Sequence, residues 1–308
     1  MRIVSSIAEV RSLLAQTQRP VGFVPTMGAL HAGHGRLIEA ARRESASVAV
    51  SIFVNPSQFN QSEDYLRYPR PLETDLAFCA AHGVDMVFAP PVEEMYPQPQ
   101  LAWVDVTRVA DHMEGRFRPG HFRGVATVVL KLLQIVQPER AYFGEKDAQQ
   151  LAVVRRLVKD LNLTVEVMGV ETVREPDGLA LSSRNQHLSA EERTIAPRIY
   201  AALQDAAKQI AAGQTNAEAV RRRATEAMSA LAEEPLMRVE YLEIADDEEM
   251  QPVEHITGPV RVAAAVWVGR TRLIDNVRCV ARGSAGARRR LLWCLRPPPR
   301  PARRTNTG

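Results

Sequence analysis

Short runs of apolar residues alternate with amphipathic segments over roughly the first 170 residues. The runs at 21–25, 47–54 and 84–88 are rich in β-branched residues, and each predicts a buried strand. The segments between them, at 36–44 and 72–82, carry apolar residues at helical spacing and predict helices. Strands that alternate with helices in this way are typical of βαβ units, in which helices cover both faces of a parallel sheet.

The same pattern continues to about residue 171. Apolar faces at 125–137 and 151–161 predict two more helices, the run 163–170 predicts another strand, and 140–143 leads into a loop. We therefore expect an α/β domain over residues 1–171.

A different pattern follows from about residue 172. Ser189 and Glu192 have the spacing of a capping box and predict the start of a helix. Two helices and two strands are predicted near 190–212, 216–233, 238–244 and 260–268. The expected second unit is a smaller α+β domain at 172–280.

Charge separates the body of the chain from its C-terminal tail. The 308 residues include 39 Lys+Arg and 36 Asp+Glu, for a formal net charge of +3. Residues 278–308 hold nine arginines and no acidic residue, so the rest has 30 basic and 36 acidic residues. Such an acidic body has no general attraction for nucleic acid. The Pro- and Arg-rich segment 281–308 is predicted to be disordered. It is either an arm for nucleic acid or acidic lipid, or an extension without function.

Cysteine usage and the N-terminus favour a cytoplasmic protein. The three cysteines, Cys79, Cys279 and Cys294, have no metal-binding spacing and are too few for a disulfide scaffold. Neither a signal peptide nor an apolar stretch of the ~20 residues that a membrane span needs is visible. We therefore expect no membrane as a partner. The acidic body of the chain leads us to expect no nucleic acid either.

The strongest chemical signal is TMGALHAGH at 26–34, between the first predicted strand and its helix. The carboxyl end of a parallel strand is where open α/β sheets bind ligands. A helix N-terminus offers free N–H groups to phosphate, and Gly33 allows a nucleotide to approach the backbone. His31 and His34 are three residues apart, which predicts that both lie on one helical face. The alternative is that the histidines and glycines form only a turn and a helix cap.

Two further segments carry candidate anion-binding groups. FGEKDAQQ at 143–150 places Lys146 in a Gly-containing loop before a helix, where its alternative is an ordinary surface lysine. REPDG at 174–178 predicts a turn. It is followed by Ser182, Ser183 and Arg184, which either bind polyphosphate or form a plain polar loop.

These segments together resemble the pantothenate synthetase (pantoate–β-alanine ligase) family of the nucleotidylyltransferase superfamily, which has a Rossmann-like fold. The resemblance runs from about Ile3 to Val277. It rests on the blocks VPTMGALHAGH at 24–34, FVNPSQF at 53–59, RPGHFRGVATVV at 118–129, FGEKDAQQL at 143–151, REPDGLALSSRN at 174–185 and TRLIDNV at 271–277. It implies that ATP and pantoate give pantoyl adenylate and pyrophosphate, and that β-alanine then displaces AMP.

The resemblance also implies roles for individual residues. His34, as proton donor or purely electrostatic group, would act in catalysis with His31 and Lys146. Gln58 would bind pantoate and β-alanine, Gln150 would bind pantoate, and Asn55 would support that pocket. The implied ATP-binding residues are Met27, Gly28, Ala29, Leu30, His31, Ala32, Gly33, His34, Gly144, Glu145, Lys146, Asp147, Val173, Leu181, Ser182, Ser183 and Arg184.

Some implied features are less specific. Arg118 and His121 either line the site or structure their loop and a dimer contact, and Asp75 is a candidate neighbour of the Mg²⁺ that accompanies ATP. A homodimer formed through the first domain is expected from the family. Gly35 departs from the family pattern and should weaken its helical turn by ~1 kcal/mol relative to Ala. Ala32 and Leu181 also depart from it, without removing a hydrogen-bond donor.

Two rival functions remain open. The first is adenylation of a phosphate ester by another enzyme of the superfamily, which would not need the pair Gln58 and Gln150. The second is binding through the basic tail without catalysis.

Overall fold

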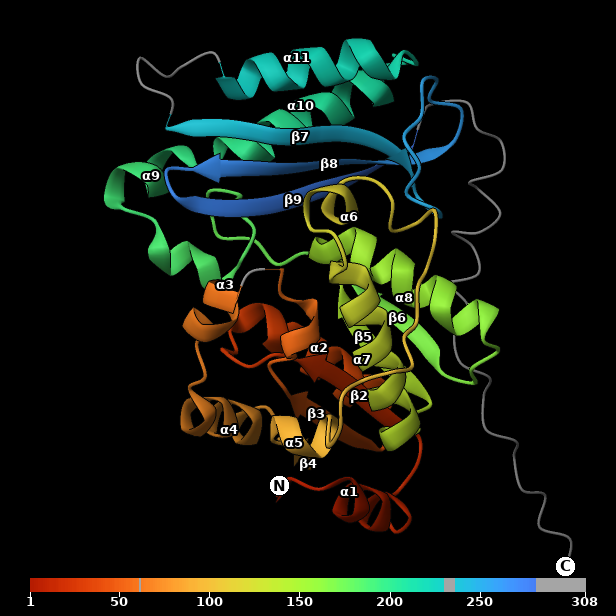
Figure 1. The fold of residues 1–308 in the computed structure, drawn as a ribbon. Coiled ribbons are helices and arrows are strands. Elements are labelled where there is room, and N and C mark those ends of the chain that lie inside the picture. The colour runs from red at the N-terminus through yellow and green to blue at the C-terminus, as the bar shows by residue number, and fades with distance from the viewer. Residues whose placement is uncertain (61, 230–235, 281–308) are drawn as a thin grey trace, which may run out of the picture.

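A computed structural model describes residues 1–60, 62–229 and 236–280 of the chain (Figure 1). The tail predicted to be disordered, 281–308, and the end of the helix predicted at 216–233 lie outside these residues. The described chain forms a six-stranded parallel sheet and a separate three-stranded antiparallel sheet, each with its own helices. This arrangement confirms the α/β fold class with a smaller C-terminal α+β part.

The strands of the parallel sheet lie in the order β1-β4-β3-β2-β5-β6, and each neighbouring pair is parallel. Their bounds are β1 Arg2–Val4, β2 Val21–Thr26, β3 Ser47–Ile52, β4 Met86–Phe88, β5 Arg140–Gly144 and β6 Glu166–Val170. The strands predicted from apolar runs are confirmed. The segment expected to lead into a loop at 140–143 is itself a strand, because its short apolar core pairs with β2 and β6 on both sides.

Helices cover both faces of this sheet, and the strands alternate accordingly. Phe23 of β2 packs with helices α1 (Ile7–Leu14), α7 (His121–Val136) and α8 (Ala148–Asp160). The next residue, Val24, packs with α2 (Ala32–Glu44) and α4 (Leu72–Ala81) on the opposite face. Three short helices complete the unit: α3 Ser62–Arg67, α5 Val92–Met95 and α6 Glu114–Phe117.

Gly35 belongs to the contact between α2 and α4. A Cβ at this position would lie 2.9 Å from Nε2 of His82 and 3.3 Å from Cζ of Phe78. The expected loss of helix propensity at Gly35 therefore accompanies a close approach of two helices that a larger residue would hold apart.

The C-terminal sheet contains β7 (Met237–Asp246), β8 (Pro259–Val268) and β9 (Thr271–Val280). One face is covered by α10 (Arg198–Ala211) and α11 (Ala217–Ser229), and the other is turned toward α6 and the first unit (Figure 1). The single helix predicted near 190–212 is two helices, α9 (Ala190–Ile195) and α10, because Pro197 cannot continue the hydrogen-bond ladder. The predicted capping box of Ser189 and Glu192 is confirmed.

Candidate active site

The chain order of the parallel sheet reverses between β2 and β5. These strands are neighbours, with Phe23 paired with Ala141, although more than a hundred residues separate them. Open α/β sheets bind their ligands in the crevice at such a reversal, beyond the carboxyl ends of the strands. The loop after β2 carries the segment 26–34, and β5 runs directly into the one-turn 3-10 helix η2 (Glu145–Asp147). The topology therefore brings the first two predicted motifs to one place.

His31 and His34 are held by the backbone at the start of α2. His31 is the N-cap of the helix, with an extended backbone, and its Nδ1 accepts a hydrogen bond from the N–H of Gly33 at 3.1 Å. Nδ1 of His34 accepts from the N–H of His31 at 3.2 Å, and the two ring centroids are 4.3 Å apart. The expectation that both lie on one helical face is thus corrected: one residue precedes the helix, and the rings meet through this reciprocal cap.

The structure gives a reason for glycine at position 33 that differs from the expected approach of a nucleotide. A Cβ at this position would lie 2.8 Å from Cε1 and 3.0 Å from Nδ1 of His31. Gly33 therefore makes room for the cap imidazole of the same chain, whatever a nucleotide also requires there.

Both imidazoles are neutral near pH 7. Burial lowers the pKa of His34 to about 3, and the neighbouring His31 and Lys146 lower it further, because a cation on His34 would be repelled by each of them in its protonated form. Burial and then the charge of Lys146 lower the pKa of His31. Because each Nδ1 accepts from a backbone N–H, the proton of each neutral ring is on Nε2. The site therefore offers two uncharged N–H donors, which suits stabilisation of phosphoryl oxygens better than donation of a proton.

Asp75 at the start of α4 clamps the loop between β2 and α2. Its Oδ2 accepts from the N–H of Ala29 at 2.9 Å, and its Oδ1 accepts from the N–H of Leu30 at 2.7 Å. Asp75 is 1% exposed. Gly28 has φ +80°, and a Cβ there would lie 2.8 Å from Oδ2 of Asp75. Both oxygens of the carboxylate are thus engaged by the loop backbone, which does not favour the expected place beside Mg²⁺.

Lys146 faces two cavities between the sheets. The larger is lined by Lys146, Asp147, Gln150, Arg118 and Arg184 among others. The charge of Lys146 also reaches His31 and His34, as their lowered pKa values indicate. These two histidines do not themselves line either cavity. Three carboxylates, of Glu114, Asp147 and Asp275, line the same cavity, but Glu114 is paired with Arg272 and Asp275 with Arg174 from outside it. The remaining balance is cationic, which favours anionic substrates.

Arg118 and His121 both face the larger cavity and both contact the backbone at Gln58. Each lines the larger cavity, and His121 Nδ1 is 2.9 Å from the carbonyl oxygen of Gln58. Arg118 donates to the same carbonyl at 3.5 Å. Burial, and then the charge of Arg118, lower the pKa of His121 to about 4. The pair therefore fixes the backbone of Gln58 from within the cavity wall.

Gln58 ends the 3-10 turn η1 (Pro56–Gln58), and its side chain is oriented by Asn55. Nδ2 of Asn55 donates to Oε1 of Gln58 at 3.0 Å, and Nε2 of Gln58 lies 2.9 Å from Sδ of Met27. Asn55 is 1% exposed, and its Oδ1 accepts from the hydroxyl of Tyr96 at 2.8 Å. Its polar atoms have partners within the chain, so the geometry favours the supporting role expected of Asn55.

Gln149 and Gln150 are neighbours with different environments. Nε2 of Gln149 donates to the carbonyls of Val109 and His112, and its Oε1 accepts from the N–H of Glu114. Gln150 is half-buried and lines the larger cavity. Both glutamines line this cavity, but the amide of Gln149 is engaged within the chain, which favours Gln150, the residue predicted from the sequence, as the one that binds a ligand.

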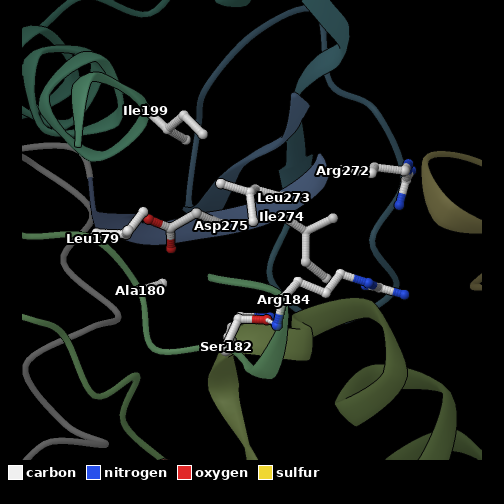
Figure 2. Close-up of a pocket in the computed structure, with 10 residues that line it drawn as sticks. Leu179, Ala180, Ser182, Arg184, Ile199, Arg272, Leu273, Ile274 and Asp275 are labelled. Carbon is white, nitrogen blue, oxygen red and sulfur yellow. Dashed lines mark hydrogen bonds between the residues drawn. The ribbon is translucent and has the colours of Figure 1, made fainter. Parts of the chain in front are cut away.

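The third motif lies against β9. Arg174 forms a bidentate ion pair with Asp275, at 2.7 and 2.9 Å, and stacks 3.6 Å above the ring of Tyr200. Ser182 caps the 3-10 helix η3 (Ser183–His187), and with Arg184 it lines the smaller cavity (Figure 2). Val173 and Leu181, which hydrogen-bond to each other through their backbones, do not line either cavity, and neither does Ser183.

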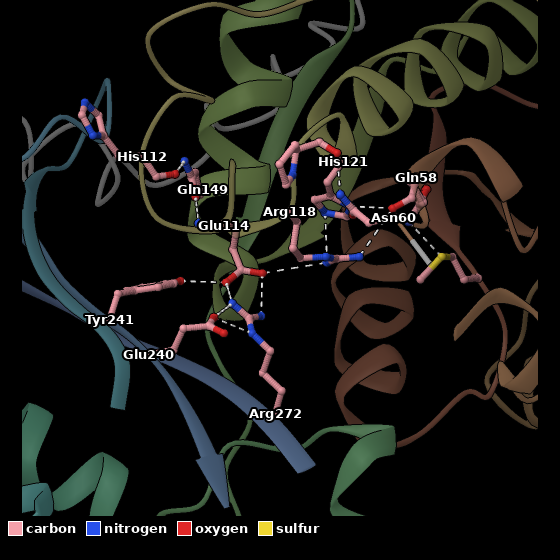
Figure 3. A network of polar contacts seen from close by, with 12 residues as sticks. Gln58, Asn60, His112, Glu114, Arg118, His121, Gln149, Glu240, Tyr241 and Arg272 are labelled. Atoms are coloured by element: carbon pink, nitrogen blue, oxygen red, sulfur yellow. Dashed lines mark hydrogen bonds and ion pairs between the residues drawn. The ribbon is translucent and has the colours of Figure 1, made fainter. Parts of the chain in front are cut away.

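A buried polar network crosses from α6 to the C-terminal sheet (Figure 3). Glu114 accepts two hydrogen bonds from Arg272 of β9, at 2.7 and 2.9 Å, and one from the hydroxyl of Tyr241 of β7 at 2.9 Å. Burial alone would raise the pKa of Glu114, but Arg272 lowers it below its usual value. Sequence reasoning missed these residues. The available signal was the alternation of Arg272 and Asn276 with apolar residues along one face of β9.

Comparison with known proteins shows one consistent relationship. A family model described as pantoate-beta-alanine ligase matches residues 2–278. The pantothenate synthetase of Thermosipho africanus is 48% identical over 280 residues, which cover 90% of this chain and 99% of that protein. The crystal structure of pantothenate synthetase from Thermus thermophilus has a TM-score of 0.84 at 50% identity, and covers 90% of this chain and 99% of that one.

One solved structure carries ligands. Pantoate-beta-alanine ligase from Francisella tularensis, described as complexed with beta-gamma ATP and β-alanine, has a TM-score of 0.72 at 36% identity, and covers 90% of this chain and 97% of that one. Within the described part of this chain, no helix is long and apolar enough to cross a membrane. The described residues also hold no group of three or more His, Cys, Asp or Glu side chains suited to a metal ion.

Proposed function

This chain belongs to the pantoate–β-alanine ligase family and is an ATP-dependent ligase of pantoate and β-alanine, and we propose that it works through a pantoyl adenylate formed beside α2 and η2. The observation that carries the proposal is the pair of neutral imidazoles at the reversal of the sheet, with the charge of Lys146 beside them. The proposed residue roles follow from that arrangement.

In the first step, a carboxylate oxygen of pantoate attacks the α-phosphorus of ATP, and the bond between that phosphorus and the α,β-bridging oxygen breaks to release pyrophosphate. Negative charge is spread over phosphoryl oxygens in the transition state, so fixed donors and cations supply the catalysis. We assign the Nε2–H groups of His31 and His34 and the ammonium of Lys146 to those oxygens. Because His34 is neutral in the free protein, we assign it as a hydrogen-bond donor rather than a general acid.

In the second step, the amine of β-alanine attacks the acyl carbon of the adenylate, and the bond from that carbon to the phosphate oxygen breaks to release AMP. The amine nitrogen loses a proton as the amide forms. We assign Gln58 and Gln150 to pantoate, with Gln58 also at the entry of β-alanine. The cationic lining by Arg118 and Arg184 supports an approach by the anionic substrates.

Other features of the ATP site stay proposals. We assign to the nucleotide the residues Gly144, Asp147, Ser182 and Arg184. Val173, Leu181 and Ser183, which do not line either cavity, are assigned as supporting residues. The domain at 172–280 is proposed to cover the nucleotide. Mg²⁺ is proposed to arrive as part of the ATP substrate, since the carboxylate of Asp75 is engaged by the backbone. A homodimer through residues 1–171 and a cytoplasmic location complete the proposal. Sedimentation equilibrium tests the dimer.

The test of the mechanism is isotope exchange between pyrophosphate and ATP with pantoate present and β-alanine absent. Exchange that depends on pantoate is expected, because the adenylate forms reversibly before the amine binds. A folded enzyme that makes pantothenate but shows no exchange without β-alanine would contradict the two-step route. Omission of pantoate is the matched control.

A further inference from the structure

We propose that Asn276 of β9 is a positioning residue for Lys146, so that the C-terminal sheet sets the place of the catalytic ammonium. The inference rests on the proposed role of Lys146. Nδ2 of Asn276 donates to two successive carbonyl oxygens of η2, those of Glu145 and Lys146, each at 2.9 Å. One side chain from 130 residues along the chain thus holds the backbone that carries Lys146.

The orientation of the Asn276 amide is fixed by its partners. A backbone carbonyl only accepts a hydrogen bond, so the nitrogen of the amide must face η2. A guanidinium only donates, so the amide oxygen must face Arg261, whose Nη1 lies 2.8 Å away. Asn276 and Arg261 are each 5% exposed, so exchange of these bonds for water is restricted. The amide therefore has one stable orientation, and it points its donors at the loop.

Arg261 extends the same clamp to the side chain of the loop. Its Nη2 donates to Oε2 of Glu145 at 3.2 Å, and its Nε donates to Oδ1 of Asp247 at 2.9 Å. Asp247 lies just beyond β7, while Arg261 and Asn276 lie on β8 and β9. The loop is thus fixed through both its backbone and Glu145 by a rigid part of the second sheet.

The consequence concerns where the Lys146 side chain reaches. Both carbonyls are drawn toward β9, and the Lys146 side chain faces the cavities and the histidines of α2. A loop freed from Asn276 keeps its lysine but not its fixed position, and displacement of a reacting group by about 1 Å can cost about 100-fold in rate. Gln58 is carried by η1 and Gln150 by α8, whereas the side-chain hydrogen bonds of Asn276 go to η2 and Arg261, so pantoate binding is expected to be unaffected.

The test compares Asn276→Ala and Asn276→Asp by pantoate-dependent pyrophosphate–ATP exchange. Asn276→Ala removes both donors and is expected to lower kcat by about 10- to 100-fold with an unchanged KM for pantoate. Asn276→Asp retains the shape of the side chain and an oxygen for Arg261, but it places a second oxygen against the two carbonyls. The kcat of this variant is therefore expected to fall as far as that of Asn276→Ala. Asn276→Asp also tests the inference if the alanine variant does not fold. Exchange at the wild-type rate in folded Asn276→Asp would overturn the inference.

A double-mutant cycle separates positioning from general damage. If Asn276 acts through Lys146, then Asn276→Ala has less than about a two-fold effect in the Lys146→Ala background. The same large factor in both backgrounds overturns the inference and leaves the role of Lys146 intact. A Lys146→Ala enzyme with full exchange instead overturns the proposed role of Lys146, and this inference with it. Val262→Ala, in the buried core of the same sheet, is the control for lost stability and is expected to keep its kcat.

Discussion

The backbone N–H of His31 donates to Nδ1 of His34 at 3.2 Å, and this bond determines which nitrogen of His34 is available to a substrate. With Nδ1 engaged, the neutral ring carries its proton on Nε2. The same rule applies to His31, whose Nδ1 accepts from Gly33. Histidine side chains often act as acids in enzymes, but His31 and His34 are held here as uncharged hydrogen-bond donors.

His34 is expected to stay in its neutral Nε2–H form from pH 8 down to pH 5, since burial lowers its pKa to about 3. A long-range proton–nitrogen NMR titration of the free enzyme checks this, with the His34 signals assigned by their loss in His34→Ala. A titration midpoint near 6.5 would refute the neutral form. The alanine variant should also lose about 10²–10³ in turnover while it remains folded, as for a removed oxyanion donor.

The stability of the protein should fall with acid partly through His121. Its pKa is about 4 when folded and about 6.5 when unfolded, so the unfolded chain binds the proton more readily. This contribution is complete above pH 6.5 and is lost as the pH falls toward 4, by about 2–3 kcal/mol. Urea unfolding of the wild type and His121→Asn at pH 7.5 and 4.5 measures it. Equal losses in the two proteins would show that His121 is not responsible.

Gly124→Ala should disturb the pantoate side of the site. A Cβ on Gly124 of α7 would lie 2.3 Å from the carbonyl oxygen of Ser57 and 2.7 Å from Cα of Gln58. We expect a loss of about 1–3 kcal/mol in stability and a raised KM for pantoate, because η1 must move. Gly258→Ala is the control, since no atom lies within 4 Å of its Cβ position. Unchanged pantoate kinetics in Gly124→Ala would mean that Gln58 is not fixed by this contact.

Asp75→Asn distinguishes a loop clamp from a metal ligand. The carboxylate accepts from the N–H groups of Ala29 and Leu30, whereas an amide offers one acceptor and sets a donor against the other N–H. We expect a loss of about 1–3 kcal/mol in stability and a raised KM for ATP. Titration with Mg²⁺ at fixed ATP provides the check. Recovery of activity at high Mg²⁺ would favour a metal role for Asp75 instead.

Gln149→Ala and Gln150→Ala should affect different properties, stability in the first variant and pantoate binding in the second. Gln150→Ala is expected mainly to raise the KM for pantoate, since this side chain lines the cavity without the protein partners that engage Gln149. Gln149→Ala leaves two carbonyls and one N–H without their partner, and should mainly lower the melting temperature. Steady-state kinetics and thermal unfolding of both variants measure the contrast. If pantoate binding depends on Gln149 and not on Gln150, the pocket has been placed wrongly.

The sequence predicts the parallel sheet well because strands such as β2 and β3 are buried on both faces and are apolar throughout. It does not reveal β1, whose three residues are mostly exposed, or the strand at β5, whose apolar core is very short. These strands depend on their neighbours in the sheet rather than on a pattern of their own.

The features of the candidate site also fall into two groups, those that a local sequence pattern reveals and those that depend on contacts between distant residues. The loop residues of the first two motifs could be found because a strand, glycines and histidines stand together in the chain. The pairing of Glu114 with Arg272 could not, because it joins residues 158 positions apart. The clamp of Asp75 was equally hidden, since its partners are backbone N–H groups that no residue type encodes.

Because β9 is the last strand that the structure describes, the order of synthesis matters to this enzyme. A nascent chain can make the motifs of the first sheet long before Arg272 and Asn276 have been translated. Until then Glu114 lacks its guanidinium, and η2 lacks the amide that holds its carbonyls. The motif-bearing loops of the first sheet are therefore made early on the ribosome, but the contacts that hold Glu114 and η2 are complete only after β9 has been translated.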